Sequence, residues 1–171
     1  SRVDSIDESG RPAIPERVGP YEISGLIFGS DLSWVYRGYD PRMARTVAIK
    51  IPPPWALGDA ELFSIYETEA KLIARIDHPN IVKAYDFEAL PGVDRTVDDT
   101  NISVWDPPSL YTVMEFIPRS LADLIKQNIT ISINESIRVA VEVCKGVAYL
   151  HSLGLVHGDL KPGHILVGDN S

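Results

Sequence analysis

The end of the chain, residues 156–171 with the sequence VHGDLKPGHILVGDNS, is a short segment rich in titratable side chains. His157, Asp159 and Lys161 stand at alternate positions, and His164 follows a Pro-Gly pair. Proline followed by glycine is typical of a loop. Three interpretations are open at this point: a working catalytic loop, a loop that has lost its activity, or an accident of composition.

A long helix is expected to lead into this loop. Residues 132–154 begin with Ser132 and Glu135 at the spacing of a capping box. Gly154 stands where a helix C-terminal glycine is expected. Apolar residues recur along one face, which predicts a buried helix in which Cys144 is a small buried hydrophobic residue. The face consists of Ile137, Ala140, Val141, Cys144, Val147 and Ala148.

The first half of the chain has the pattern of an antiparallel sheet. Strands are expected at residues 21–28, 34–40, 46–51, 80–90 and 110–117. Turn residues separate the first three of these stretches. In the third, Val47, Ile49 and Ile51 point to one face, and Ala48 and Lys50 point to the other. A lysine between apolar strand residues needs an anionic partner.

A helix is expected over residues 59–77, after a proline-rich connection at residues 52–60. Its apolar face consists of Leu62, Tyr66, Ile73 and Ile76. Glu69 lies on that same face. Because Glu69 and Lys50 each lack another obvious partner, they are a candidate ion pair.

Composition narrows the class of protein. A length of 171 residues suggests one domain, and strands followed by helices predict an α+β fold. The formal net charge of −8 argues against nucleic-acid binding, and no apolar stretch of about 18 residues predicts a membrane span. A single cysteine fits a reducing compartment, so we expect a cytoplasmic protein.

Two polar segments are expected to lie outside the packed core. Residues 1–19 have the composition of a flexible leader, and residues 87–108 form a long, acidic, proline-bounded interruption that predicts a mobile insertion. The first methionine is Met43, so we expect that the chain is cut from a longer protein.

Four motifs in this order resemble a protein kinase of the serine/threonine branch. They are VAIK at 47–50, HPNIV at 78–82, YTVMEF at 111–116 and YLHSLGLVHGDLKP at 149–162. The resemblance implies an antiparallel small lobe with one helix and the hinge over residues 20–117. Residues 118–171 would be the first helices and catalytic loop of the helical large lobe.

The resemblance also implies roles for single residues. Lys50 would hold the α- and β-phosphates of ATP, oriented by Glu69. Asp159 would accept or orient the proton of the attacking hydroxyl of a protein substrate, and Lys161 would place positive charge near the transferring phosphoryl group. The adenine ring would contact Val35, Ala48, Leu166, the gatekeeper Met114 and the backbone of Glu115 to Ile117. Plain core packing is the alternative for the three aliphatic residues.

The phosphate loop departs from the family pattern. Aligned on the strand that follows, the segment FGSDLS has Phe28, Ser30 and Ser33 where the family has glycines, and only Gly29 is left nearby. Those glycines let backbone amides approach the phosphates. Asp31 adds negative charge there. We expect weakened ATP binding.

The catalytic loop departs from the pattern twice. Gly158 replaces the arginine that senses activation-loop phosphorylation, and His164 replaces the metal-binding asparagine. Imidazole suits Mn²⁺ better than Mg²⁺, so either His164 binds a metal ion or it points elsewhere and one metal is lost.

The family's Asp-Phe-Gly motif does not occur before Ser171. We therefore expect a truncated kinase domain, inactive alone, from an active serine/threonine kinase that uses ATP with Mg²⁺ or Mn²⁺. The alternative is a pseudokinase, a binding or scaffold module with weak or no phosphoryl transfer. The sequence does not indicate an oligomeric state.

Overall fold

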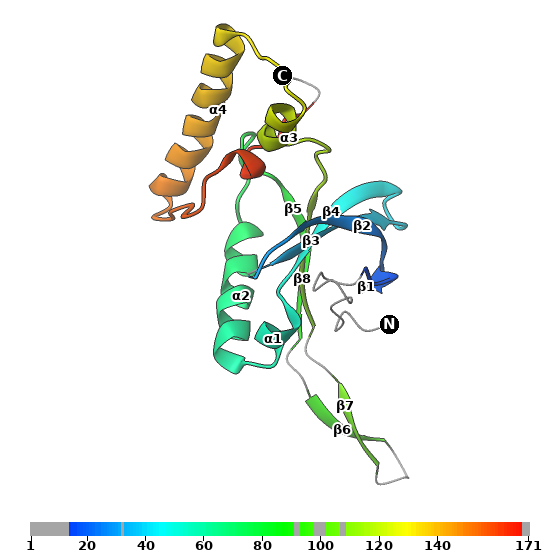
Figure 1. Ribbon diagram of the computed structural model, residues 1–171. Coiled ribbons are helices and arrows are strands. Elements are labelled where there is room, and N and C mark those ends of the chain that lie inside the picture. Colours follow the sequence, from blue (N-terminus) through cyan, green and yellow to red (C-terminus); the bar gives the residue numbers. More distant parts are fainter. Residues whose placement is uncertain (1–13, 32, 91–92, 98–101, 107–108, 169–171) are drawn as a thin grey trace. The chain divides into compact units, whose positions relative to one another are not determined.

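The computed structural model describes residues 14–31, 33–90, 93–97, 102–106 and 109–168 (Figure 1). Its contacts divide the chain into two compact units. The first comprises Ser1–Ile76 and Ala84–Phe116, and the second comprises Asp77–Lys83 and Ile117–Ser171. The second unit thus includes a segment from the middle of the predicted small lobe.

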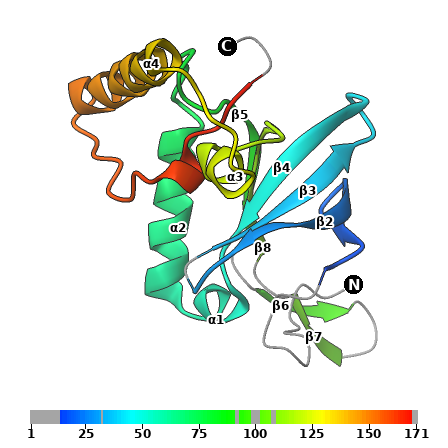
Figure 2. The same ribbon diagram turned by 45° about the horizontal axis from the view of Figure 1, so that its top comes forward.

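The first unit is built on a six-stranded antiparallel sheet (Figures 1 and 2). In spatial order its strands are β1 (Arg17–Val18), β2 (Tyr21–Gly29), β3 (Trp34–Asp40), β4 (Arg45–Ile51), β8 (Ser109–Glu115) and β5 (Ala84–Leu90). The Tyr21 hydroxyl donates to the Asp86 carboxylate at 2.9 Å. This bond joins β2 to β5, which lie near opposite ends of the strand order, so the sheet is curled.

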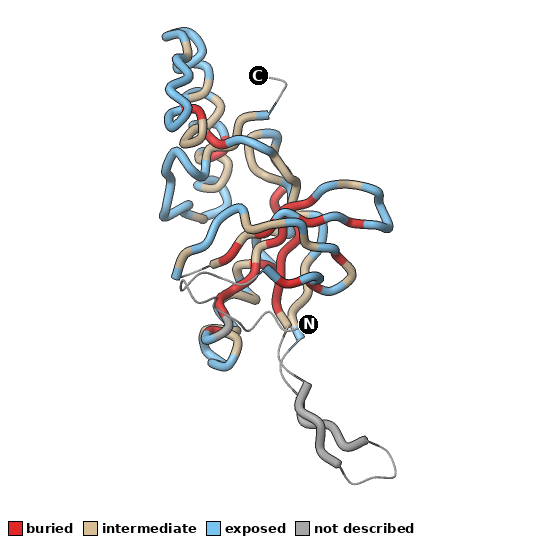
Figure 3. The backbone as a smooth tube through the Cα atoms, turned by 45° about the vertical axis from the view of Figure 1, so that its right-hand side comes forward, coloured by how far each residue is buried: buried red, intermediate tan, exposed pale blue. Residues whose placement is uncertain are grey.

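Side-chain alternation places the core on one face of this sheet. Val47, Ile49 and Ile51 are buried, as the sequence predicted, and they pack with Tyr36 and Val113 from the neighbouring strands. Figure 3 shows the buried parts of the chain in red, gathered mainly in the centre of the first unit. Lys50 therefore points to the face of β4 opposite this core.

The main helix of the first unit, α2 (Ala60–Ile73), follows a one-turn helix, α1 (Pro54–Leu57). The Asp59 carboxylate caps α2 by accepting the backbone N–H groups of Glu61 and Leu62 at 2.9 and 3.0 Å. The predicted face from Leu62 to Ile76 is buried or half-buried, which confirms it. The helix ends four residues earlier than its pattern predicted.

The second unit is helical. It contains α3 (Leu121–Lys126), α4 (Ile133–Ser152) and a 3-10 turn, η1 (Pro162–His164). The predicted capping box is present, because the Ser132 N–H donates to Glu135 at 2.7 Å and the Glu135 N–H donates back at 3.2 Å. Gly154 follows α4 with φ of +73°, a conformation that favours glycine.

Segment Asp77–Lys83 is anchored on α4. The His78 ring stacks on Tyr149 with centroids 4.8 Å apart, and the Asn80 side-chain amide donates to Glu142 at 2.6 Å. Between these contacts, a Cβ atom added at Gly146 would lie 2.9 Å from the Asn80 carbonyl oxygen. The close approach of this segment therefore requires a glycine in the helix.

Replacing Gly146 with alanine should destabilise the chain. Alanine in a helix interior is normally more favourable than glycine by about 1 kcal/mol. Here the added methyl group meets a backbone oxygen, and overpacking of this kind costs about 1–3 kcal/mol. Thermal unfolding of Gly146→Ala should show a lower Tm. Ala140→Gly, at an exposed position of the same helix, is the control that measures only the difference in helix propensity between alanine and glycine. A raised Tm for Gly146→Ala would contradict the close contact with the Asn80 carbonyl oxygen.

Four expectations from the sequence are corrected. The predicted apolar face of α4 is mostly exposed among the described residues, and Cys144 is exposed with it. The helix instead turns Gly146 toward Asp77–Lys83. The leader was expected to stay flexible up to residue 19, but Val18 pairs with Tyr21 and is 5% exposed.

The other two corrections concern connections. The proline-rich connection contains α1, because Pro54 at the first helical position loses no hydrogen bond. The interruption at 87–108 is not structureless: β5 runs to Leu90, and β6 (Val93–Val97) pairs with β7 (Ile102–Asp106) in a separate two-stranded sheet. Residues 1–13, also assigned to the leader, lie outside the described residues.

Candidate active site

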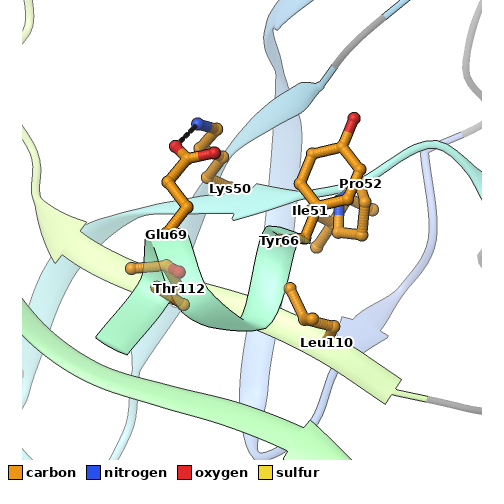
Figure 4. A pocket seen from close by; sticks show the side chains of 8 residues that line it. Lys50, Ile51, Pro52, Tyr66, Glu69, Leu110 and Thr112 are labelled. Carbon is orange, nitrogen blue, oxygen red and sulfur yellow. Dashed lines mark hydrogen bonds and ion pairs between the residues drawn. The ribbon is translucent and has the colours of Figure 1, made fainter. Parts of the chain in front are cut away.

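Lys50 on β4 and Glu69 on α2 form the ion pair that the sequence predicted (Figure 4). The Lys50 Nζ donates to Glu69 Oε1 at 2.5 Å. The two side chains are 27% and 43% exposed. Ion pairs open to water contribute at most about 1 kcal/mol to stability. The value of this pair is therefore orientation: it holds one ammonium group in a fixed direction.

The pairing of β3, β4 and β8 places the predicted ATP-binding residues of these strands on the same face of the sheet as Lys50. Val35 and Thr112 lie opposite Lys50 on the two neighbouring strands, and Met114 lies opposite Ala48. Residues directly opposite each other share a face. Three predicted residues, Val35, Ala48 and Met114, thus lie around the lysine, on the face away from the aromatic and aliphatic core.

A small cavity beside the ion pair includes residues that sequence reasoning missed as site residues. Tyr66 and Thr112 line it together with Lys50, Glu69 and Leu110 (Figure 4). The Thr112 side chain is 4% exposed, and burial raises the pKa of Tyr66 with a further contribution from Glu69. The strand alternation could have indicated Thr112, because it stands two residues before Met114 and so faces the same way.

Of the predicted hinge residues, Glu115 and Phe116 belong to the first unit and Ile117 to the second. Glu115 ends β8 opposite Val47, so its side chain points away from the face of Lys50. The guanidinium of Arg37 lies over the Phe116 ring at 5.2 Å from its centroid. Ile117 is half-buried and begins the helical unit.

The phosphate loop is closed by its two serines. Gly29 ends β2 opposite Trp34 at the start of β3. The Ser30 N–H donates to the Ser33 carbonyl at 3.0 Å, and the Ser33 N–H donates to Ser30 Oγ at 3.2 Å. Two backbone amides of the loop thus already have acceptors within the loop. Asp31 is exposed beside them, so the loop offers phosphate less than a glycine-rich loop would.

Asp159 in the second unit has a partner for each of its polar groups. Its carboxylate accepts from Lys161 Nζ at 2.7 Å, and its N–H donates to His157 Nδ1 at 3.4 Å. Its carbonyl oxygen lies 2.7 Å from His164 Nδ1. Gly158, which replaces the family's arginine, has φ of +75°, so the loop uses backbone geometry that favours glycine.

Backbone bonds fix the segment that carries Leu166. The Leu121 N–H donates to the Ile165 carbonyl at 2.7 Å, and the Val167 N–H donates to the Arg119 carbonyl at 2.9 Å. Leu166 itself forms a bridge with Ser120 and is half-buried. Residues 165–167 are therefore anchored to the start of α3.

The hydrogen bond from Lys161 lowers the pKa of Asp159, and the charges of Lys161, His164 and His157 lower it further. Lys161→Met should therefore raise the pKa of Asp159 toward its ordinary value. Because the folded-state pKa is lowered, the stability that this group contributes is present above the unfolded pKa and is lost as pH falls through the folded value. In the variant the folded and unfolded pKa values of Asp159 lie closer together, so this pH-dependent contribution to stability should become smaller.

A pH titration of the Asp159 carboxyl carbon by NMR measures this shift. Lys145→Met is the matched control, because Lys145 pairs with Glu142 at 2.6 Å in the same unit and should leave Asp159 unchanged. An unchanged Asp159 pKa in Lys161→Met would contradict the assignment.

Two negative findings apply to the described part of the chain. No three or more His, Cys, Asp or Glu side chains gather there in a way that could hold a metal ion, so a metal role for His164 stays a prediction. No helix in that part combines the length and the apolar character that crossing a membrane requires.

Known proteins share this sequence pattern. A family model described as "Protein kinase domain" matches residues 28–171. The probable serine/threonine-protein kinase PknB of Bifidobacterium longum is 30% identical over 152 residues, which are 88% of this chain and 21% of the relative. A probable serine/threonine-protein kinase of Clostridium acetobutylicum is 32% identical over 151 residues, 88% of this chain and 20% of the relative. The chain thus spans about a fifth of the length of these relatives.

The fold is also shared with solved kinase domains. The crystal structure of the Mycobacterium tuberculosis PknI kinase domain matches with a TM-score of 0.66 and 18% identity. The match covers 93% of this chain and 60% of that one. The antiparallel sheet with one main helix, followed by helices, is therefore a protein-kinase-like α+β fold. The chain belongs to the protein kinase domain family.

Proposed function

We propose that this chain is the nucleotide-binding and catalytic-loop part of a serine/threonine protein kinase that transfers the γ-phosphate of ATP to protein hydroxyls. The observation that carries the proposal is the Lys50–Glu69 ion pair at 2.5 Å. Phosphoryl transfer depends on positioning and on charge stabilisation, because the nucleotide supplies the reactive group. In such a site, the ammonium group of Lys50, oriented by Glu69, would bind the phosphates.

In this proposal Lys50 binds the α- and β-phosphates, and Val35, Ala48 and Met114 contact the adenine ring from the same sheet face. Leu166 adds an apolar contact, and the backbone of Glu115 to Ile117 offers hydrogen bonds to the ring edge. The phosphates are covered by the loop that contains Gly29, Ser30 and Ser33. ATP binding is weakened there, because the hydrogen bonds between the two serines must break or shift before the loop amides can bind phosphate.

The helical unit supplies the chemistry on the hydroxyl side. Asp159 orients the serine or threonine hydroxyl and accepts its proton, and Lys161 adds positive charge where the transferred group carries negative charge. The lowered pKa of Asp159 favours the ionised form that a proton acceptor needs. A bound divalent ion would neutralise phosphate charge; if His164 were one of its ligands, the imidazole nitrogen would suit Mn²⁺ better than Mg²⁺.

A cytoplasmic location agrees with the single cysteine, which has no disulfide partner and is exposed. The domain would there meet ATP and protein substrates directly. We assign no oligomeric state.

Thermal unfolding with nucleotide tests the binding part of the proposal. A ligand at about 100 times its Kd stabilises a protein by roughly 2.7 kcal/mol. For a chain of this size we expect a Tm rise on the order of 5–10 °C. The scan is run with ATP and Mg²⁺, with ATP and Mn²⁺, and with ATP and EDTA. A shift with Mn²⁺ alone would assign manganese-dependent nucleotide binding; no shift under any condition would contradict the proposal and favour a scaffold module.

A further inference from the structure

The 3-10 turn after the catalytic residues returns His164 to Asp159. The His164 N–H donates to the Lys161 carbonyl at 2.8 Å, which closes the turn. His164 Nδ1 then lies 2.7 Å from the Asp159 carbonyl oxygen and 3.7 Å from its carboxylate Oδ2. The His164 side chain is 31% exposed and the Asp159 side chain 65% exposed, so the contact lies at the surface of the unit.

The chemistry of this contact fixes the position of a proton. A carbonyl oxygen only accepts hydrogen bonds, and so does an ionised carboxylate. His164 Nδ1 faces both, so it must carry the hydrogen, and the lone pair of the neutral ring is on Nε2. His78 in the same unit has the opposite arrangement, because its Nδ1 accepts the Asn80 N–H at 3.1 Å.

We infer that His164 is a positioning residue that fixes the backbone of Asp159 by donating an Nδ1–H hydrogen bond to its carbonyl oxygen. The inference rests on the proposed function, in which Asp159 is the catalytic residue. The carboxylate of Asp159 is exposed, and Lys161 alone would hold it on a long, flexible side chain. A bond to the adjoining peptide group restricts the backbone from which that carboxylate projects, and catalysis is sensitive to such misplacement.

The first test is spectroscopic and needs no activity. Two-dimensional ¹⁵N NMR of the neutral side chains distinguishes the two tautomers of each histidine in this chain. We expect the Nδ1–H tautomer for His164 and the Nε2–H tautomer for His78, which is the internal control. An Nε2–H tautomer for His164 would overturn the inference.

The second test compares two variants of the full-length protein. His164→Asn keeps a donor on the atom attached to Cγ, whereas His164→Phe keeps a ring without a donor. At saturating metal we expect His164→Phe to lower kcat on the order of 10- to 100-fold with little change in the KM for ATP, because misplacing a catalytic group costs turnover. His164→Asn should recover most of that loss.

Three results would overturn the inference: full activity in His164→Phe, equal loss in both variants although both fold, or a loss in His164→Phe at limiting metal that saturating metal restores. The last result would assign His164 to the metal ion. Circular dichroism and thermal unfolding establish that each variant is folded. If the wild type transfers no phosphate at all, the proposed function fails, and the tautomer measurement still decides the His164 bond.

Discussion

Replacing Lys50 with methionine is expected to lower phosphoryl transfer by the full-length protein at least about 100-fold, the range seen when one preorganised charge-stabilising group is removed. Glu69 fixes the direction of this ammonium group, and Val35 and Thr112 flank it on the same sheet face. Methionine keeps the length and apolar stem of the side chain and removes only the charge. Nucleotide-dependent stabilisation of the chain should disappear as well.

The measurement is the initial rate of transfer from γ-labelled ATP, together with the Tm shift on adding nucleotide. Lys71→Met is the matched control: it removes a lysine from α2 whose partner is Glu67 at 2.8 Å, four residues away. The control should retain both activity and the shift. Undiminished transfer by Lys50→Met would show that Lys50 does not hold the phosphates.

Replacing Asp159 with asparagine should lower phosphoryl transfer but leave nucleotide binding intact. The variant is nearly isosteric but can no longer accept a proton, so transfer should fall by about 10²- to 10⁴-fold. The nucleotide contacts assigned to Lys50 and its sheet face remain, so the nucleotide-dependent Tm shift should persist.

Asp77→Asn is the control for this variant, because Asp77 is 83% exposed and pairs with Lys83 at 3.3 Å in the same unit. It should leave transfer unchanged. If Asp159→Asn transferred phosphate at the wild-type rate, the catalytic assignment of Asp159 would be wrong. If it lost the Tm shift but kept turnover, Asp159 would belong with nucleotide binding.

Local sequence chemistry predicted much of the fold. The alternation of Val47, Ile49 and Ile51 against Lys50 and the capping box at Ser132 each involve neighbours in the chain, and both are present. The contact between Lys50 and Glu69 was predictable although the residues are far apart in sequence. Each was a charged group among apolar residues, and the family motif supplied the pairing.

Features that depend on packing against residues distant in the sequence were not predictable from the local pattern. The apolar stripe around Cys144 predicted burial, but periodicity gives the direction of a face and not what covers it. The side of α4 that is packed among the described residues is instead the one with Gly146 against Asn80. The strands β6 and β7 were missed because acidic and proline residues mask their alternation.

The candidate site shows the same limit at the level of single bonds. The sequence revealed that serines replace glycines in the phosphate loop, but not that Ser30 and Ser33 bond to each other. It raised two alternatives for His164, metal ligand or side chain directed elsewhere. The bond to the Asp159 carbonyl gives that side chain a specific direction, which no residue spacing could have indicated.

Transfer of labelled phosphate from ATP to a serine- and threonine-containing protein such as casein is the most direct test of the central claim. The full-length protein is assayed with Mg²⁺ and with Mn²⁺, and the labelled residues are identified after acid hydrolysis. We predict phosphoserine or phosphothreonine with at least one of the two ions, abolished in Asp159→Asn. Nucleotide binding without label on any hydroxyl with either ion would contradict the kinase assignment and identify a binding module instead.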